Sequence, residues 1–230
     1  MIAGIMQPYF FPYFGYFQLI NAVDHFIIHD DVQYIKGGWI ARNRLSKNGA
    51  PEYFRLAVSK APHDTEIRQM QAADPAGDLK KLYGQFQSFY ARAPHRQQVL
   101  DLVSDGPQTT ALGDINLHFL RRVCDLLEIE TPITLASEMD VAPGLAGKDK
   151  VIALVKAAGA DKYVNPVGGK SLYRRDDFDA AGLRLAFLSM APDGTLDGWS
   201  ERLSVLDLLA RNELHEMRAA LDSFVLEPSE

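Results

Sequence analysis

The 230-residue chain has a single cysteine, Cys124, so it has no partner for an internal disulfide. It also lacks any apolar run near the roughly 18 residues that a membrane-spanning helix requires. No basic region of the kind that opens a signal peptide precedes the first apolar residues. Such cysteine usage suits a reducing compartment. We therefore expect a cytoplasmic protein with no membrane segment, in which Cys124 is a buried thiol.

Positive charge is in deficit, because 24 Lys and Arg face 30 Asp and Glu and give a net charge of −6. This balance argues against general binding to nucleic acids or membrane surfaces, which requires basic patches. It leaves room for a small basic pocket that holds a nucleotide. With 47% hydrophobic residues and 23% charged residues of mixed sign, residues 1–230 are expected to fold as a single globular domain.

The motifs of several enzyme classes are missing. The six histidines are scattered, and His25 and His29 are four residues apart in a predicted strand, where that spacing does not make a metal-binding pair. There is no Gly-x-Ser-x-Gly nucleophile elbow, and Cys124 has no obvious base nearby. We therefore expect neither a zinc site nor hydrolysis through a serine or cysteine nucleophile.

The most informative stretch present is residues 7–43, which begins with seven aromatic residues at positions 9–17. A short apolar run precedes it, and a second run at 26–28 ends at Asp30 and Asp31. This order predicts strand, stiff loop, short helix, strand and acidic loop, the first unit of an α/β sheet. Ligands bind beyond the carboxyl ends of the strands in such sheets, so the aromatic loop and the acidic loop should meet over one crevice.

The rest of the chain alternates between strand and helix patterns. Strands are predicted at 2–6, 25–29, 53–58, 133–135, 162–164 and 183–188, and helices at 15–22, 78–90, 96–103, 112–127, 148–158 and within 204–221. The alternation predicts an α/β fold with a central, mostly parallel sheet. A helical segment at about 75–128 is inserted between the sheet-forming halves. The last residues, 227–230, are expected to be frayed.

Four segments and the pair Ser137-Glu138 resemble the WbqC-like family, and the resemblance extends over nearly the whole chain. The four segments are QPYFFPYFGYFQLINAVDHFIIHDDVQYIKGGWIARNRL at 7–45, YARAP at 90–94, YVNPVGGKSLY at 163–173 and LSVLDLLARN at 203–212. The resemblance implies a part in the synthesis of bacterial surface polysaccharides, above all the O-antigen of lipopolysaccharide. It also implies transfer of glycine to a sugar, which has been suggested for members of the family.

The first loop can also be compared with α/β folds of the nucleotidylyltransferase type. In those folds a His-x-Gly-His loop opens the first helix, and a late Lys-Ser loop closes over phosphates. Here residues 13–16 (YFGY) and 168–171 (GGKS) hold the matching places. Tyrosines replace both histidines, and a phenol with a pKa near 10 stays neutral where a histidine could become cationic. Either the chemistry differs from adenylyl transfer, or only the fold is alike.

One wall of the predicted site comes from the aromatic loop. Gln7 lies at the end of the first strand, where an amide can fix a carbonyl or hydroxyl group, and Tyr9 follows it. Gly15 lets the backbone approach a ligand at a helix N-terminus, which favours anions. Tyr13 and Tyr16 are candidate catalytic groups that could donate hydrogen bonds to a phosphate. The alternative is that the tyrosines pack over the sheet edge.

Asp30 and Asp31 are the other candidate catalytic groups. They directly follow an apolar strand, and the two-residue period of a strand sends them to opposite sides. One carboxylate should therefore reach the crevice first, and it could hold an ammonium group, a sugar hydroxyl or a divalent ion. An amine substrate would also require a base before it attacks. The alternative is that one aspartate caps the loop and the other is solvated, and the sequence leaves open which of them acts.

Polar and aromatic residues after the acidic pair complete the predicted site. Trp39 follows two glycines, and an exposed indole there would stack on a partner. Arg42 offers a planar fork for phosphate or carboxylate. Lys170 follows paired glycines that could cradle a phosphate, although the full P-loop spacing is missing. A solvated hairpin and a surface turn are the alternatives. The other predicted substrate-binding residues are Gln33, Tyr34, Asn43, Asn165 and Ser171.

The leading hypothesis is a transferase that forms an acyl or aminoacyl amide on a nucleotide-linked amino sugar. Its substrates would be a sugar nucleotide and an amino acid or acyl donor, and a charged tRNA is the one nucleic acid that could serve as donor. The use of ATP with magnesium stays open, and so does a homodimer. The alternatives are an ATP-dependent nucleotidylyl or adenylyl transferase or ligase, and a non-catalytic module that binds sugar nucleotides.

Overall fold

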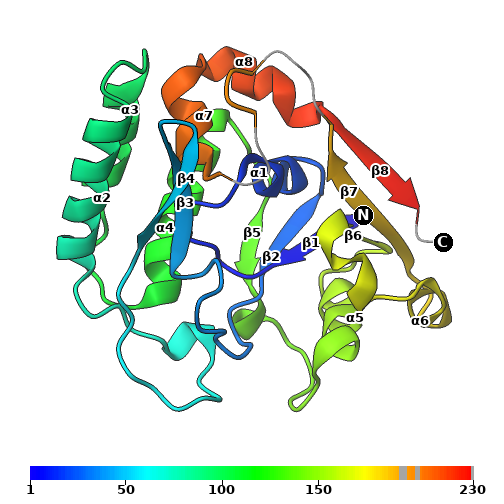
Figure 1. Ribbon diagram of the computed structural model, residues 1–230. Coiled ribbons are helices and arrows are strands. Elements are labelled where there is room, and N and C mark those ends of the chain that lie inside the picture. The colour runs from blue at the N-terminus through cyan, green and yellow to red at the C-terminus, as the bar shows by residue number, and fades with distance from the viewer. Residues whose placement is uncertain (192–195, 200–202, 229–230) are drawn as a thin grey trace.

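The computed structural model describes residues 1–191, 196–199 and 203–228. Its centre is a six-stranded sheet with the order β5-β2-β1-β6-β7-β8 (Figure 1). The strands are β1 (Ile2–Met6), β2 (His25–Ile28), β5 (Ile133–Leu135), β6 (Lys162–Pro166), β7 (Arg184–Met190) and β8 (Phe224–Pro228). Neighbouring strands are parallel except β7 and β8, which are antiparallel. The predicted α/β class with a mostly parallel sheet is confirmed.

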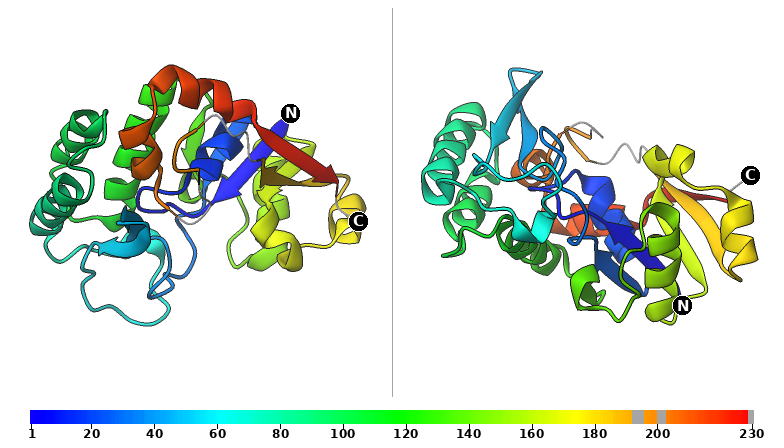
Figure 2. Two further views of the ribbon diagram at one scale, coloured as in Figure 1. Left: turned by 45° about the horizontal axis from the view of Figure 1, so that its top comes forward. Right: turned by 90° about the horizontal axis from the view of Figure 1, so that it is seen from below.

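A separate antiparallel hairpin and a set of helices complete the described part of the fold. The hairpin strands are β3 (Arg42–Lys47) and β4 (Ala50–Arg55). The helices are α1 (Phe14–Asn21), α2 (Pro75–Phe89), α3 (Arg96–Ser104), α4 (Leu112–Leu127), α5 (Gly147–Ala157), α6 (Arg175–Ala180), α7 (Val205–Arg211) and α8 (Leu214–Ala219). Short 3₁₀ segments are Ile67–Gln69, Ala136–Glu138, Val167–Leu172 and Ala220–Asp222. Helices α2 to α4 fall in the predicted helical segment, and α2 and α3 lie at the opposite end of the molecule from α6 and β8 (Figures 1 and 2).

The end of the chain corrects one prediction. The sequence predicts fraying at 227–230, but Glu227 and Pro228 belong to β8, which pairs with β7. The Glu227 carboxylate accepts a hydrogen bond from the Ser189 hydroxyl at 2.9 Å. An edge strand offers free backbone groups to any segment that can reach it, and local sequence patterns do not reveal that partner. Residues 229–230 lie outside the described part of the chain.

Two hydrophobic clusters cover the two faces of the sheet. In β2, Phe26 and Ile28 pack into the larger cluster with α1 and α4, whereas Ile27 packs into the smaller cluster with α5. The same period of two assigns His29, the next residue, to the face that α5 covers. Cys124 is buried in the larger cluster, as predicted. None of the helices in the described ranges combines the length and the apolar character that a membrane crossing requires.

The order of the strands reverses beside β1. Strands β2 and β5 lie on one side of it, and β6 and β7 lie on the other. Residues of α1, which follows β1, belong to the larger cluster, and those of α5, which precedes β6, belong to the smaller cluster on the other face. Such a reversal opens a crevice beyond the carboxyl ends of the two central strands. Gln7 and Asn165 lie at those two ends, so the fold itself indicates where to look for a site.

Candidate functional site

Buried side chains hold the aromatic loop, residues 7–13, in place. The amide nitrogen of Asn116 donates to the Pro8 carbonyl at 2.9 Å, and that of Asn43 donates to the Phe11 carbonyl at 2.7 Å. Phe11 has a φ of 45°, a left-handed conformation that these bonds help to maintain. Asn43, predicted to bind substrate, therefore has its amide nitrogen engaged with the loop.

The structure places the tyrosines of this loop in packing. Tyr16 is fully buried, and its hydroxyl donates to the Gln7 carbonyl at 2.9 Å. Burial raises the pKa of Tyr16 well above its usual value, and it raises the pKa of Tyr9 as well. Gly15 is buried too, and a Cβ there would lie only 2.7 Å from the Tyr13 ring. Of these residues, the partly exposed Gln7 is the one that the strand order places at the switch point.

Asp30 and Asp31 have different partners, as the two-residue period of a strand predicts. Asp30 is buried, and its carboxylate accepts hydrogen bonds from the Ser137 backbone N–H at 3.0 Å and the Ser137 hydroxyl at 2.6 Å. Asp31 forms an ion pair with Lys150 of α5, with 2.8 Å between Oδ2 and Nζ. The Lys150 ammonium also donates to the Asp31 backbone carbonyl at 2.9 Å. Asp30 thus ties β2 to the segment after β5, whereas Asp31 is held against α5.

His29 joins Asp31 and Lys150, and these three residues form what we call the edge cluster. The His29 backbone N–H donates to the Met6 carbonyl at 2.8 Å, which fixes the residue beside the end of β1. His29 Nε2 lies 3.9 Å from Asp31 Oδ1, and neither buried atom has a hydrogen-bond partner. Burial lowers the pKa of His29, an effect that Asp31 opposes and Lys150 reinforces. The imidazole is therefore neutral at pH 7 and able to accept a proton.

This lowered pKa predicts how acid affects stability. The unfolded chain binds a proton at His29 more readily than the folded chain does, so stability falls as the pH drops from 7 towards 5. The variant His29→Asn has no imidazole that can bind this proton, so it should lose less stability between pH 7 and pH 5. Urea unfolding at pH 7 and pH 5 would measure both losses. Equal losses for the two proteins would contradict the assignment.

The residues that follow β6 divide between the site and the surface. Asn165 is buried, and its side chain packs on Gly169, where a Cβ would lie 2.1 Å from Asn165 Nδ2. Lys170 is exposed and forms an ion pair with Glu227 of β8, and Ser171 is exposed as well. The glycine thus supports Asn165 at the switch point, whereas the Lys170 ammonium is directed towards β8.

The glycines offer a matched pair of substitutions. Gly169→Ala forces the Asn165 amide to move and should lower the free energy of unfolding by about 1–3 kcal/mol, the usual range for overpacking. Gly168→Ala meets no atom within 4 Å and should change it by less than about 0.5 kcal/mol. Urea titration of both variants would measure the difference. A Gly169→Ala variant as stable as Gly168→Ala would show that Asn165 is not held in this way.

The other predicted binding residues lie in the segment from Gln33 to Arg42, which leads from β2 into the β3–β4 hairpin. Gln33 Nε2 donates to the His63 carbonyl at 2.7 Å. Arg42 stacks over the Tyr53 ring, with its Cζ 4.7 Å from the ring centre, and Trp39 lies under another arginine of β3. Tyr34 is partly buried, and burial raises its pKa. The predicted residues therefore do not form one group, because some lie at the sheet edge, Trp39 and Arg42 lie at the hairpin, and Gln33 and Lys170 contact other segments.

Sequence reasoning missed His29 and Lys150 as site residues. A signal for His29 was available, since it directly precedes Asp30-Asp31 at the end of a predicted strand. Lys150 has no local signal, because it meets Asp31 from 119 positions further along the chain.

Within residues 1–191, 196–199 and 203–228, no three His, Cys, Asp or Glu side chains gather in a way that could hold a metal ion.

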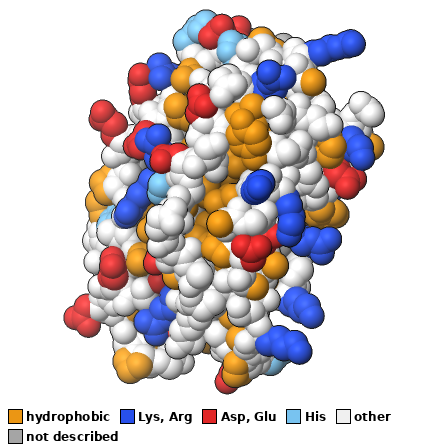
Figure 3. All heavy atoms as spheres, turned by 90° about the vertical axis from the view of Figure 1, so that its left-hand side faces the viewer, with side chains coloured by type: hydrophobic (Ala, Val, Ile, Leu, Met, Phe, Trp, Pro, Cys, Tyr) orange, Lys and Arg blue, Asp and Glu red, His pale blue; other side chains and the backbone are white. Residues whose placement is uncertain are grey.

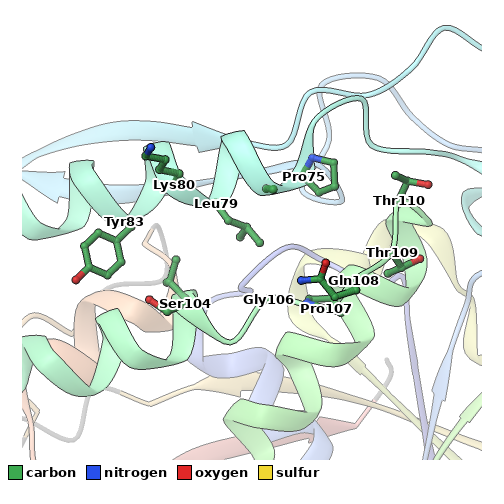
Figure 4. A pocket seen from close by; sticks show the side chains of 12 residues that line it. Pro75, Leu79, Lys80, Tyr83, Ser104, Gly106, Pro107, Gln108, Thr109 and Thr110 are labelled. Carbon is green, nitrogen blue, oxygen red and sulfur yellow. The ribbon is translucent and has the colours of Figure 1, made fainter.

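A hollow of about 750 Å³ opens between α2 and the segment from the end of α3 to Thr110 (Figure 4). Leu79 and Tyr83 line one side of it, and Pro107 and Thr109 line the other. Figure 3 shows this side of the molecule, where apolar side chains form a strip between flanking charged groups. None of the predicted site residues lines the hollow, and its lining holds no acid–base pair, so the edge cluster is the better candidate for a functional site.

Comparison with known proteins agrees with the sequence motifs. The profile of the WbqC-like protein family matches residues 7–219, a range that includes the whole edge cluster. A protein of Mycobacterium tuberculosis (strain ATCC 25618 / H37Rv), named "Uncharacterized protein Rv1507c", is 28% identical over 216 residues, which are 90% of this chain and 91% of that protein. No solved structure gives a significant match, so the likeness to nucleotidylyltransferases stays a prediction.

Proposed function

Because the chain belongs to the WbqC-like protein family, we propose that it transfers an acyl or aminoacyl group, such as glycyl, to the amino group of a nucleotide-linked sugar in surface polysaccharide synthesis. One observation carries the proposal: His29 Nε2 and Asp31 Oδ1 are buried, lack hydrogen-bond donors and lie 3.9 Å apart. Leaving such acceptors unsatisfied is costly. An amino group placed between them would donate to both, with the imidazole in its Nδ1–H tautomer.

The edge cluster also supplies a route for the proton. The nitrogen–carbon bond of the amide forms as the amine attacks the acyl carbon, and the bond from that carbon to its oxygen or sulfur leaving group breaks. The neutral His29 takes one proton from the amine nitrogen and passes it to the leaving group. Lys150 bonds to both Oδ2 and the backbone carbonyl of Asp31, which leaves Oδ1 for the amine.

Gln7 and Asn165 are proposed to position the substrates. Gln7 directly follows β1, and Asn165 is the second-to-last residue of β6. The two strands pair with each other, with Gly4 opposite Val164. A side-chain amide near the reacting carbon could donate to the developing oxyanion, and such donors contribute strongly to catalysis. An ester or thioester donor would need no further activation. A free amino acid would need ATP with magnesium to activate its carboxyl group.

A product assay tests the proposal. Purified protein would be incubated with nucleotide-linked amino sugars and with glycine plus ATP and magnesium, a glycyl thioester or glycyl-tRNA. We expect a sugar nucleotide heavier by one aminoacyl group with one of these donors. Pyrophosphate release without sugar would favour adenylyl transfer instead. Sugar-nucleotide binding without turnover on any donor would favour the non-catalytic module.

A further inference from the structure

The outer face of the β3–β4 hairpin carries arginines and no carboxylate. Along each strand, alternate residues face outward, and the pairing register puts Arg42 opposite Arg55 and Arg44 opposite Tyr53. Asn43, which lies between Arg42 and Arg44 in the sequence, is buried on the other face. This concentration of positive charge contrasts with the net charge of −6 of the whole chain.

Two of these arginines are stacked on aromatic rings and lack acidic partners. Arg42 Cζ lies 4.7 Å from the centre of the Tyr53 ring, and Arg44 Cζ lies 4.8 Å from that of Trp39. Arg44 is also 5.8 Å from the Tyr53 ring, so both guanidinium groups share one aromatic support. Each Nε is buried without a hydrogen-bond partner, and neither arginine forms an ion pair with a residue that the structure describes.

Stacking fixes the plane of a guanidinium group and leaves its N–H edge free for an acceptor. Two such groups on alternate residues of one strand repel each other unless an anion lies against them. We propose that Arg42 and Arg44 bind the two phosphoryl groups of a nucleoside diphosphate. Planar, bidentate recognition by arginine suits phosphate oxygens, and two arginines match two phosphates.

One segment of the chain links this anion site to the edge cluster, so both could hold parts of one substrate. Residues 32–41 connect Asp31 of the edge cluster to the hairpin. Burial raises the pKa of Tyr34, which lies within them, and Arg42 is close enough to oppose that rise. The choice of a nucleoside diphosphate as ligand rests on the proposed function. The anion site itself rests only on the arginine contacts in the hairpin. Charge on the hairpin and an amine at the sheet edge would together select a nucleotide-linked amino sugar.

Calorimetric titration with pyrophosphate tests the anion site without sugar or acyl donor. The double variant Arg42→Lys, Arg44→Lys keeps both charges but removes the planar forks, and it should weaken binding by at least about tenfold. Arg121→Lys, an exposed arginine of α4, is the matched control and should leave the affinity unchanged. Unaltered thermal midpoints would show that all three proteins are folded.

Three results would overturn the proposal. Equal pyrophosphate affinity in the wild type and the double variant would remove the arginines from the site. Sulfate binding as tightly as pyrophosphate would indicate an adventitious ion only. RNA binding much more tightly than pyrophosphate would indicate a nucleic-acid surface instead. The titration contains neither sugar acceptor nor acyl donor, so it is independent of the product assay. A failed product assay would not argue against the anion site. Failed pyrophosphate binding would not argue against the edge cluster, which turnover tests.

Discussion

Asp31→Asn is expected to lower the turnover number about 100-fold or more, the order of loss that follows when a reacting group is no longer held in position. The substitution removes the negative charge that would hold an amine between Oδ1 and His29 Nε2, atoms that are 3.9 Å apart. It also weakens the link to Lys150, so the folded fraction must be known. Initial rates of amide formation by mass spectrometry, corrected by circular dichroism for the folded fraction, would measure the effect.

Asp30→Asn is the matched control for this experiment. The Asp30 carboxylate accepts two hydrogen bonds from Ser137, so the variant should lose about 1–3 kcal/mol of stability. Its corrected turnover should stay within about tenfold of the wild type, since the Asp30 carboxylate is engaged with Ser137 and contacts neither the amine nor His29 in the proposed mechanism. If Asp30→Asn lost more turnover than Asp31→Asn, the roles assigned to the two aspartates would be reversed.

Asn116→Leu should give the largest loss of stability among the substitutions considered. Asn116 is 1% exposed, and its amide nitrogen donates to the carbonyl oxygens of Pro8 and Ile40 at 2.9 and 2.7 Å. Leucine would leave both acceptors buried without a donor, at a cost of about 2–5 kcal/mol. The aromatic loop would lose the support that links it to α4. Urea unfolding would measure the change.

Asn21→Leu provides the comparison for that measurement. Its amide also donates a hydrogen bond, to Asp222 at 3.0 Å, but the bond is exposed to water. The free energy of unfolding should therefore change by only about 0.5 kcal/mol. If the two variants differed by less than about 1 kcal/mol, the loop would not depend on Asn116 in the way that the structure indicates.

The architecture could be predicted because it follows from local patterns. The apolar runs that end at Met6 and Ile28 are typical of buried parallel strands, and the two strands do pair with each other. The period of two also separated Asp30 from Asp31 correctly. These features depend on residues that are close in the sequence, so hydrophobic pattern and turn chemistry were sufficient to find them.

The site was harder to predict because its contacts join distant segments. The composition of the aromatic loop does not show which way a phenol points, and Tyr16 is buried because α1 packs its ring against Phe26. Lys150 reaches Asp31 only once α5 covers that face of the sheet. Lys170 is paired with Glu227 because the last residues form β8, which the sequence pattern did not indicate.

A crystal structure of the protein with a nucleotide-linked amino sugar would show whether the edge cluster holds the amino group of the sugar. We expect the amino nitrogen of the sugar between His29 Nε2 and Asp31 Oδ1, at roughly 2.7–3.2 Å from each. An amino group bound elsewhere, for example in the hollow between α2 and α3, would contradict this expectation.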